Sequence, residues 1–348
     1  LYKEKYKLIF GRKVLSEDEA WRGEIGLPRV LNMHEDYPFW NAFFNSLGFR
    51  IVLSPPGSKK LYEMGMDTIA SDTACYPAKL VHGHIKWLVN KGIKRIFYPC
   101  IQYEVVEDPT AANHYNCPIV ATYPEVIDKN MADLFYENNV EFYHPFLPFD
   151  RDDRLVDEMY KFFRGERQID NEALENINKT YNFDDDSRDY SLLHMNISKE
   201  ELREAVKAGR ESYQQFKEAM RKEGDKALKY MDDNHVKGII LSGRPYHIDP
   251  EINHGIDSVI TSLGMVVLTE DSIADRVKIA RDIRVLDQWM FHSRLYRAAV
   301  FAGQRDDVEL VQLFSFGCGL DAVTTDEVNE LLDENNKLYT CLLYTSDA

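Results

Sequence analysis

The sequence predicts an α/β protein of two lobes, each built on a parallel sheet. Short apolar segments alternate with helical ones on both sides of a charged middle region, which is typical of βαβ units. The two halves also resemble each other, because NSLGFRIVLS in the first is matched by TSLGMVVLT in the second. We therefore expect Rossmann-like lobes at residues 26–149 and 237–340, joined by a helical, acidic connector at residues 150–236.

Composition narrows the classes of protein to which the chain can belong. It has 348 residues, 44% of them hydrophobic, and a net charge of −16, so about two domains are expected and a polyanionic nucleic acid would be repelled. No apolar run is long enough to span a membrane. Five cysteines without a secretory signal favour a reducing, cytoplasmic location, where thiols bind metal, react or lie inertly in the core.

In the first half, residues 1–25 form a charged segment that we expect to be a linker. After it, short apolar segments bounded by Gly, Pro or polar residues predict strands, and longer segments with helical spacing predict helices. The expected strands are Arg29–Asn32, Arg50–Ser54, Arg95–Tyr98 and Ile119–Ala121. The expected helices are Pro38–Leu47, Pro77–Lys91 and Tyr123–Tyr136.

In the second half, Ser198 and Glu201 form a capping box that opens a helix reaching about Met231. A second capping box, Thr324 with Glu327, is expected to start the last helix. The strands expected between them are GIILS (238–242), MVVLT (265–269) and Val308–Phe314, with helices after Asp249 and over Gln288–Ala302.

Three cysteines occupy positions where α/β sheets present ligands. Cys75 precedes a helix start, where the helix dipole favours thiolate, and Cys100 and Cys318 follow strands that match in the two halves. We interpret these three, with Cys117 as an additional candidate, as ligands of an iron–sulfur cluster. Three thiolates would leave one iron open, whereas four would favour electron transfer alone. Inert burial is the alternative, and zinc is not favoured because no C-x₂₋₄-C pair occurs.

A second candidate site is GRPYHIDPEINHG, residues 243–255, which follows a strand and leads to a helix. Arg244 could hold an anion and His247 or His254 could transfer a proton. Alternatively, Arg244 pairs with a carboxylate and His247 braces the loop. His82 and His84 lie two apart on a helix, so structural roles are expected for them.

Several strings carry a resemblance to a known family, among them CYPAKLVHGHI, IFYPCI, YNCPIVATYPEVI, GRPYHIDPEINHGI and FGCGLDAVTTDEV. From about Gly26 to Tyr339 the chain resembles the uncharacterised middle domain of the large acyl-CoA dehydratase activases, or CoA-substrate-specific enzyme activases, of anaerobic bacteria. More distantly it is similar to 2-hydroxyacyl-CoA dehydratase and benzoyl-CoA reductase subunits. That likeness implies a 4Fe–4S or double-cubane cluster on Cys75, Cys100 and Cys318, whereas Cys117 has no clear counterpart.

The resemblance also implies a function: an iron–sulfur module that takes a low-potential electron from ATP-hydrolysing activase modules and acts on an acyl-CoA. A non-catalytic electron-relay or docking domain of the activase is the alternative. The sequence lacks a GxxxxGKS or GxxxxGKT phosphate loop, so the electron would be energised elsewhere. The final residues 341–348, CLLYTSDA, resemble translated sequencing-adaptor sequence and are expected to be a non-native tail.

Overall fold

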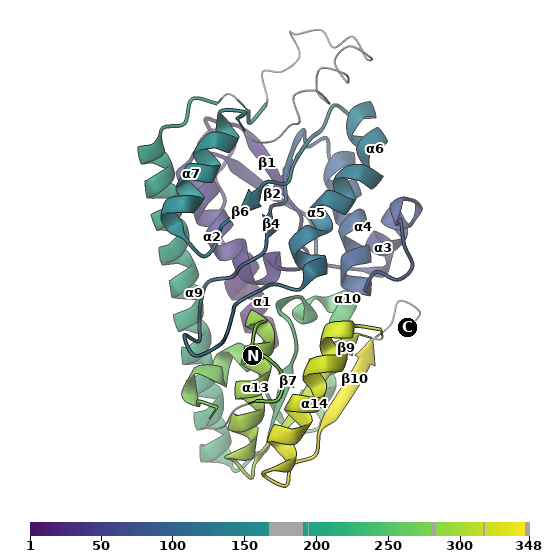
Figure 1. Ribbon diagram of the computed structural model, residues 1–348, viewed down its shortest axis with the longest axis vertical. Helices are drawn as coiled ribbons and strands as arrows, with labels where there is room; N and C mark the ends of the chain where they lie inside the picture. Colours follow the sequence, from purple (N-terminus) through teal and green to yellow (C-terminus); the bar gives the residue numbers. More distant parts are fainter. Residues whose placement is uncertain (167–190, 194, 280–282, 316, 345–348) are drawn as a thin grey trace.

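Two α/β lobes lie end to end along the long axis of the molecule (Figure 1). The computed structural model describes residues 1–166, 191–193, 195–279, 283–315 and 317–344. Within these residues no helix is long and apolar enough to cross a membrane.

The first lobe is built on a parallel sheet with the strand order β2-β1-β3-β5. Its strands are β1 (Glu24–Leu27), β2 (Arg50–Leu53), β3 (Arg95–Phe97) and β5 (Glu141–Tyr143). A separate two-stranded parallel sheet pairs β4 (Cys100–Ile101) with β6 (Phe146–Leu147). The helical elements are α2 (Met33–Ser46), α3 (Lys59–Gly65), η1 (Met66–Thr68), α4 (Tyr76–Asn90), α5 (Pro118–Asn130) and α6 (Ala132–Glu137).

The second lobe is built on a parallel sheet with the order β10-β9-β7-β8. Its strands are β7 (Gly238–Ser242), β8 (Val266–Leu268), β9 (Val308–Ser315) and β10 (Thr340–Tyr344). The helical elements are η3 (Pro245–Ile248), α10 (Pro250–Asn253), α11 (Ile256–Ser262), α12 (Glu270–Ile273), η4 (Ala274–Arg276), α13 (Met290–Gly303) and α14 (Gly319–Asp333).

The two lobes are topological repeats, as the sequence predicts. Read from β8, the second sheet runs β8-β7-β9-β10, which is the order β2-β1-β3-β5 of the first. In this correspondence α4 and α13 precede the third strand of their sheets, and α5 and α14 follow it. The fold class is therefore confirmed: two Rossmann-like lobes with parallel sheets.

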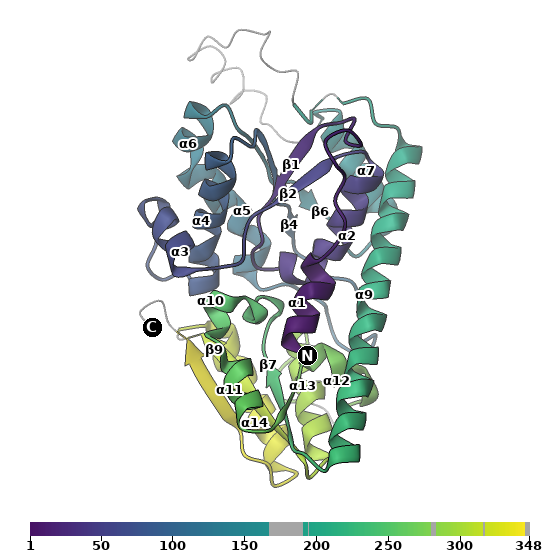
Figure 2. The same ribbon diagram turned by 180° about the vertical axis from the view of Figure 1, so that it is seen from behind.

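The described residues of the expected connector include the helices α7 (Asp152–Phe163) and α9 (Lys199–Asn234). The Ser198–Glu201 capping box opens α9 as predicted, and α9 runs beside both lobes (Figures 1 and 2). It packs on α2 and α7 of the upper half and on α12 and β8 of the lower half. The rest of the acidic segment, residues 167–190, lies outside the described residues.

Three expected elements are wrong. Arg29–Asn32 is the turn after β1, and Leu31 there has a positive φ of 41°. Ile119–Ala121 belongs to α5, because Pro118 is a favourable first helical residue. Thr324 lies inside α14, where its hydroxyl donates to the Leu320 carbonyl (2.9 Å) instead of capping a new helix.

The segment expected as a linker is folded against both lobes, and its helix packs on α2 of the first. Residues Tyr2–Phe10 form α1, and the Tyr2 hydroxyl donates to the Leu241 carbonyl (2.9 Å). The Lys5 side chain is buried, with its Nζ 2.9 Å from Asp271 Oδ2. At the other end, residues 341–344 belong to the edge strand β10, and residues 345–348 lie outside the described residues.

Candidate metal centre between the lobes

Three of the five cysteines occupy the N-cap position of a helix. Cys75 precedes α4, Cys117 precedes α5 and Cys318 precedes α14. A helix N-terminus carries unpaired N–H groups and the positive end of the dipole. Accordingly, the backbone of Ala78 lowers the pKa of Cys75 and that of Asp321 lowers the pKa of Cys318, although neither sulfur accepts a capping hydrogen bond. Each of these two sulfurs thus lies where negative charge is stabilised.

The three thiols are close enough together that neighbouring thiols affect the pKa values of Cys75 and Cys318. Burial raises the pKa of Cys75 to about 11, and the Cys117 and Cys318 thiols raise it as well, while Arg244 lowers it. Burial also raises the pKa of Cys318, again with Arg244 lowering it and Cys117 raising it. The net shift at Cys75 is opposite to the sequence-based expectation, because desolvation outweighs the helix N-terminus. Cys75 and Cys117 come from the first lobe and Cys318 from the second.

Arg244 lies against this group and is 4% exposed. Its Nη1 and Nη2 are 3.6 and 3.5 Å from the Cys318 sulfur, and its guanidinium forms an ion pair with Asp321. The His292 Nε2 lies 3.4 Å from the other carboxylate oxygen of Asp321. Arg244 therefore pairs with a carboxylate, the alternative left open above, and also presents N–H donors to a thiol sulfur.

His247 braces the loop. It is 1% exposed, and its Nδ1 accepts the backbone N–H of Arg244 (3.1 Å). Burial, aided by Arg244, holds the pKa of His247 well below its usual range, so the ring is neutral. A Cβ at Gly243 would lie 2.0 Å from the His247 Nδ1, so this packing requires glycine. His254 ends α10 in the left-handed conformation.

The two histidines of α4, His82 and His84, each form a hydrogen bond with a hydroxyl group. His82 Nδ1 lies 2.8 Å from Thr68 Oγ1, and His84 Nδ1 lies 2.7 Å from Ser54 Oγ. Burial lowers the pKa of His82 to about 4 and that of His84 to about 3. Both rings are neutral at pH 7, consistent with structural roles.

Contacts between the lobes fix the start of α4. The Tyr76 hydroxyl, one residue after Cys75, donates to Glu251 Oε1 of α10 (2.8 Å). The backbone N–H of Gly57 donates to Asp249 Oδ2 (2.9 Å), and Asp249 is the N-cap of α10. These bonds hold the Cys75 end of the first lobe against the second.

Cys100 belongs to a different group of side chains. It lies within β4, opposite Phe146 of β6, and not in a loop after a strand. Its thiol is fully buried beside Glu125 and His144, and burial together with Glu125 raises its pKa to about 12. The topological counterpart of Cys318 is therefore Cys117, since each caps the helix that follows the third strand of its lobe. A sequence signal for this existed: Pro closely follows both Cys75 and Cys117.

The residues around the three thiols fit an iron–sulfur cluster. A Cβ at Gly317 or Gly319 would meet no atom within 4 Å, so open space flanks Cys318. Cluster sulfurs accept N–H hydrogen bonds, and the helix N-termini and Arg244 provide such donors. The protein ligands offered to the cluster are the three thiols.

Two parallel-sheet lobes with three helix-capping thiols between them define an α/β protein with a candidate metal centre at the lobe interface. The chain belongs to the CoA enzyme activase uncharacterised domain family (DUF2229), whose family model matches residues 24–273. That match includes Cys75, Cys117 and Arg244, whereas Cys318 lies beyond it. No curated protein matches the chain.

Proposed function

We propose that this chain is the iron–sulfur cluster module of an ATP-dependent 2-hydroxyacyl-CoA dehydratase or acyl-CoA reductase system. The observation that carries the proposal is that Cys75, Cys117 and Cys318 each precede a helix N-terminus. The Cys117 thiol raises the pKa of the other two, and Arg244 lowers the pKa of both Cys75 and Cys318. Membership in the CoA enzyme activase domain family supports the assignment to this system.

In this proposal Cys117 takes the place that the sequence-based hypothesis gave to Cys100. The three thiolates hold the cluster, which supplies one-electron chemistry when bound. Since burial raises the pKa of Cys75 to about 11, its thiol is protonated at pH 7 until a metal displaces the proton. Arg244 offsets part of the negative charge of the thiolates and donates N–H groups to the Cys318 sulfur.

Three thiolates favour a catalytic module over an electron relay. A 4Fe–4S cluster on three cysteines has one iron without a protein thiolate, where an acyl-CoA carbonyl or hydroxyl could bind. A closed four-thiolate site would need a further cysteine, and Cys100 is directed toward Glu125 and His144. The electron would come from an ATP-hydrolysing activase module, in the same longer chain or as a partner, in a reducing cytoplasm.

Iron and acid-labile sulfide analysis of single variants tests the ligand set. After anaerobic reconstitution, the chain should contain iron and sulfide, with a visible absorbance that bleaches in air. Cys75→Ser, Cys117→Ser and Cys318→Ser should each lower the bound iron, because each removes a thiolate ligand. An EPR spectrum of the reduced protein that changes on addition of an acyl-CoA would favour the catalytic form of the proposal.

Matched controls are available in the same chain. Cys100→Ser and the exposed Cys341→Ser should leave the iron content unchanged. The proposal fails if Cys75, Cys117 and Cys318 variants all retain full iron, or if Cys100→Ser loses iron while Cys117→Ser does not.

A further inference from the structure

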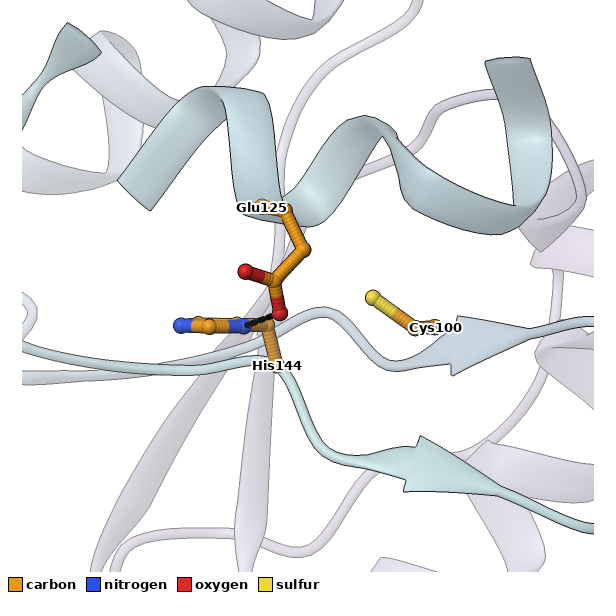
Figure 3. A group of neighbouring side chains, drawn as sticks. All are labelled: Cys100, Glu125 and His144. Atoms are coloured by element: carbon orange, nitrogen blue, oxygen red, sulfur yellow. Dashed lines mark hydrogen bonds and ion pairs between the residues drawn. The ribbon is translucent and has the colours of Figure 1, made fainter. Parts of the chain in front are cut away.

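A second group of potential metal ligands lies apart from the three helix-capping thiols. Figure 3 shows the sulfur of Cys100 pointing toward the carboxylate of Glu125 and the ring of His144. One ligand atom from each of these side chains lies within 4.8 Å of the other two. We propose that Cys100, Glu125 and His144 bind a divalent transition-metal ion of the zinc type.

The separations suit tetrahedral coordination. Zinc binds sulfur at about 2.3 Å and nitrogen or oxygen at about 2.0–2.2 Å, which places neighbouring tetrahedral ligands roughly 3.4–3.6 Å apart. The His144 Nδ1 and Glu125 Oε1 are already 2.9 Å apart, so they need only separate slightly to admit the ion. Thiolate, imidazole and carboxylate together form a ligand set that suits zinc.

The backbone holds the ligands in place. The Cys100 N–H donates to the Pro145 carbonyl (2.9 Å) and the Tyr98 N–H to the Tyr143 carbonyl (2.8 Å). These bonds hold the segments that carry Cys100 and His144 side by side, while Glu125 comes from α5. The Phe142 ring stacks on the His144 imidazole, with centroids 5.5 Å apart. The site is therefore assembled from rigid elements before any ion binds.

Asp128 completes the arrangement from the next turn of α5. Its Oδ1 lies 3.5 Å from the His144 Nε2, on the side of the ring away from Glu125. In metal sites, a ligating histidine commonly donates its second N–H to a carboxylate, which fixes the tautomer. With Nε2–H directed to Asp128, the Nδ1 lone pair is directed to the ion.

An ordinary ion pair would account for His144 with two carboxylates but not for the thiol. His114 and Asp150 form such a pair at 3.4 Å elsewhere in the first lobe. Here a buried thiol is added to the pair. Its S–H group is only a weak hydrogen-bond donor, whereas a cation between the three side chains would engage the thiolate, the imidazole and the carboxylate together. On binding, the Cys100 thiol and the His144 Nδ1 release their protons to solvent.

The ion would tie β4, the segment between β5 and β6, and α5 together. Because Cys117 caps α5, the same ion would fix the position of that thiol. The fourth coordination position faces outward, since the Glu125 side chain is 40% exposed and His144 20%. The site does not depend on the cluster proposed above, because it uses none of its cysteines.

Cobalt(II) titration of a full-length variant tests the site without interference from other thiols. Cys75, Cys117, Cys318 and Cys341 are replaced by Ser, leaving Cys100 alone. One equivalent of Co²⁺ should produce a thiolate-to-cobalt charge-transfer band that one equivalent of Zn²⁺ abolishes. A further Cys100→Ser change should remove the band, and Asp128→Asn should weaken Zn²⁺ binding by about 10–100-fold. His114→Gln is the matched control and should bind normally.

Zinc analysis of the iron-loaded chain gives an independent readout if the multiple variant does not fold. Cys100→Ser and His144→Gln should each lose one zinc per chain while retaining iron. The proposal is overturned if no charge-transfer band forms in a folded Cys100-only chain, or if zinc content is the same in wild type, Cys100→Ser and His144→Gln.

Discussion

At the scale of single residues, two carboxyl groups adjoin in the interior of the first lobe. Asp36 of α2 and Glu104 after β4 are each 1% exposed. Asn116 donates to the Glu104 Oε1 (2.6 Å), and Asn32 donates to the same oxygen. Burial, with Glu35 nearby, raises the pKa of Glu104 to about 7, and burial with Glu104 raises that of Asp36. The pair is therefore most stable when it holds a proton.

The first prediction follows from that proton. A carboxyl whose folded pKa is raised binds protons more tightly when folded, so stability falls as pH rises from about 4.5 through about 7. The difference between these two pKa values corresponds to about 3 kcal/mol. Glu104→Gln keeps the oxygen acceptor but cannot ionise, so its free energy of unfolding should decline less between pH 5 and 8. Urea unfolding at several pH values measures this.

The control for this prediction is Glu218→Gln, at an exposed position on α9. Its profile should parallel that of the wild type. Glu104→Gln and wild-type profiles that run parallel as well would show that Glu104 does not carry the proton.

At the same scale, the candidate site was only partly predictable. Cys75 and Cys318 were predicted as ligands from their positions beside predicted helix and strand ends, and the structure places both at helix N-caps. Cys100 was misplaced because β4 is only two residues long, too short for a periodic pattern. The helix N-cap position of Cys117 was not foreseen, because the segment after it was expected to be a strand. Glu125 and His144 were not singled out, since they reach Cys100 only through the pairing of β4 with β6.

At the scale of elements, α9 approaches each lobe closely through a glycine. A Cβ at Gly209 would lie 2.6 Å from the Phe39 ring, and one at Gly224 would lie 2.4 Å from the Ser272 carbonyl oxygen. A ring can shift slightly, whereas a backbone carbonyl in α12 cannot move without moving its helix. Gly224 therefore determines how closely α9 packs on the second lobe.

The second prediction is that Gly224→Ala destabilises the protein despite better helix propensity. Alanine should gain up to about 1 kcal/mol of propensity. Because the contact is with a backbone oxygen, overpacking should cost about 2–3 kcal/mol, the upper end of its usual range, so a net loss of about 1–2 kcal/mol is expected. Chemical denaturation measures it. Lys222→Ala, at an exposed position of the same helix, should stay within about 0.5 kcal/mol of wild type. A Gly224→Ala protein as stable as wild type would contradict the close approach.

Strong local patterns made most elements predictable. The Ser198–Glu201 capping box, Pro77 at a helix start and the apolar strand Gly238–Ser242 all appear as expected. The first strand was misplaced because Glu24–Leu27 contains one β-branched residue and a glycine, whereas Val30 and Leu31 next to it look more strand-like. Glu24–Leu27 is the strand because it pairs with β2 and β3, and this pairing is not visible in the local sequence.

At the scale of the whole molecule, buried ion pairs join the lobes, and the sequence did not reveal them. Arg294 of α13 is fully buried, and its Nη2 lies 2.5 Å from Glu35 Oε1 and 2.7 Å from Glu107 Oε1. Lys217 of α9 lies 3.0 Å from Glu35 and 2.6 Å from Glu107. Charged residues in a sequence usually indicate exposed faces, so only the assembled lobes identify these as interior.

This network gives the last prediction, the response to Arg294→Met. Burial opposes ionisation of Glu35, but Arg294 and Lys217 outweigh it and hold its pKa at about 2. Removing Arg294 leaves the buried Glu35 paired with Lys217 alone, which Glu107 shares, while Arg297 reaches only Glu107 (3.6 Å); such a loss typically costs about 3–5 kcal/mol. The stabilisation by a lowered carboxyl pKa is present above about pH 4.5 and is lost as pH falls toward 2. The deficit of Arg294→Met should therefore be largest near pH 7 and shrink in acid, as measured by urea unfolding.

Arg305→Met, which breaks partly exposed pairs with Asp232 and Asp307, should cost no more than about 1 kcal/mol. Equal, small losses in both variants would mean that the interlobe ions do not hold the lobes together.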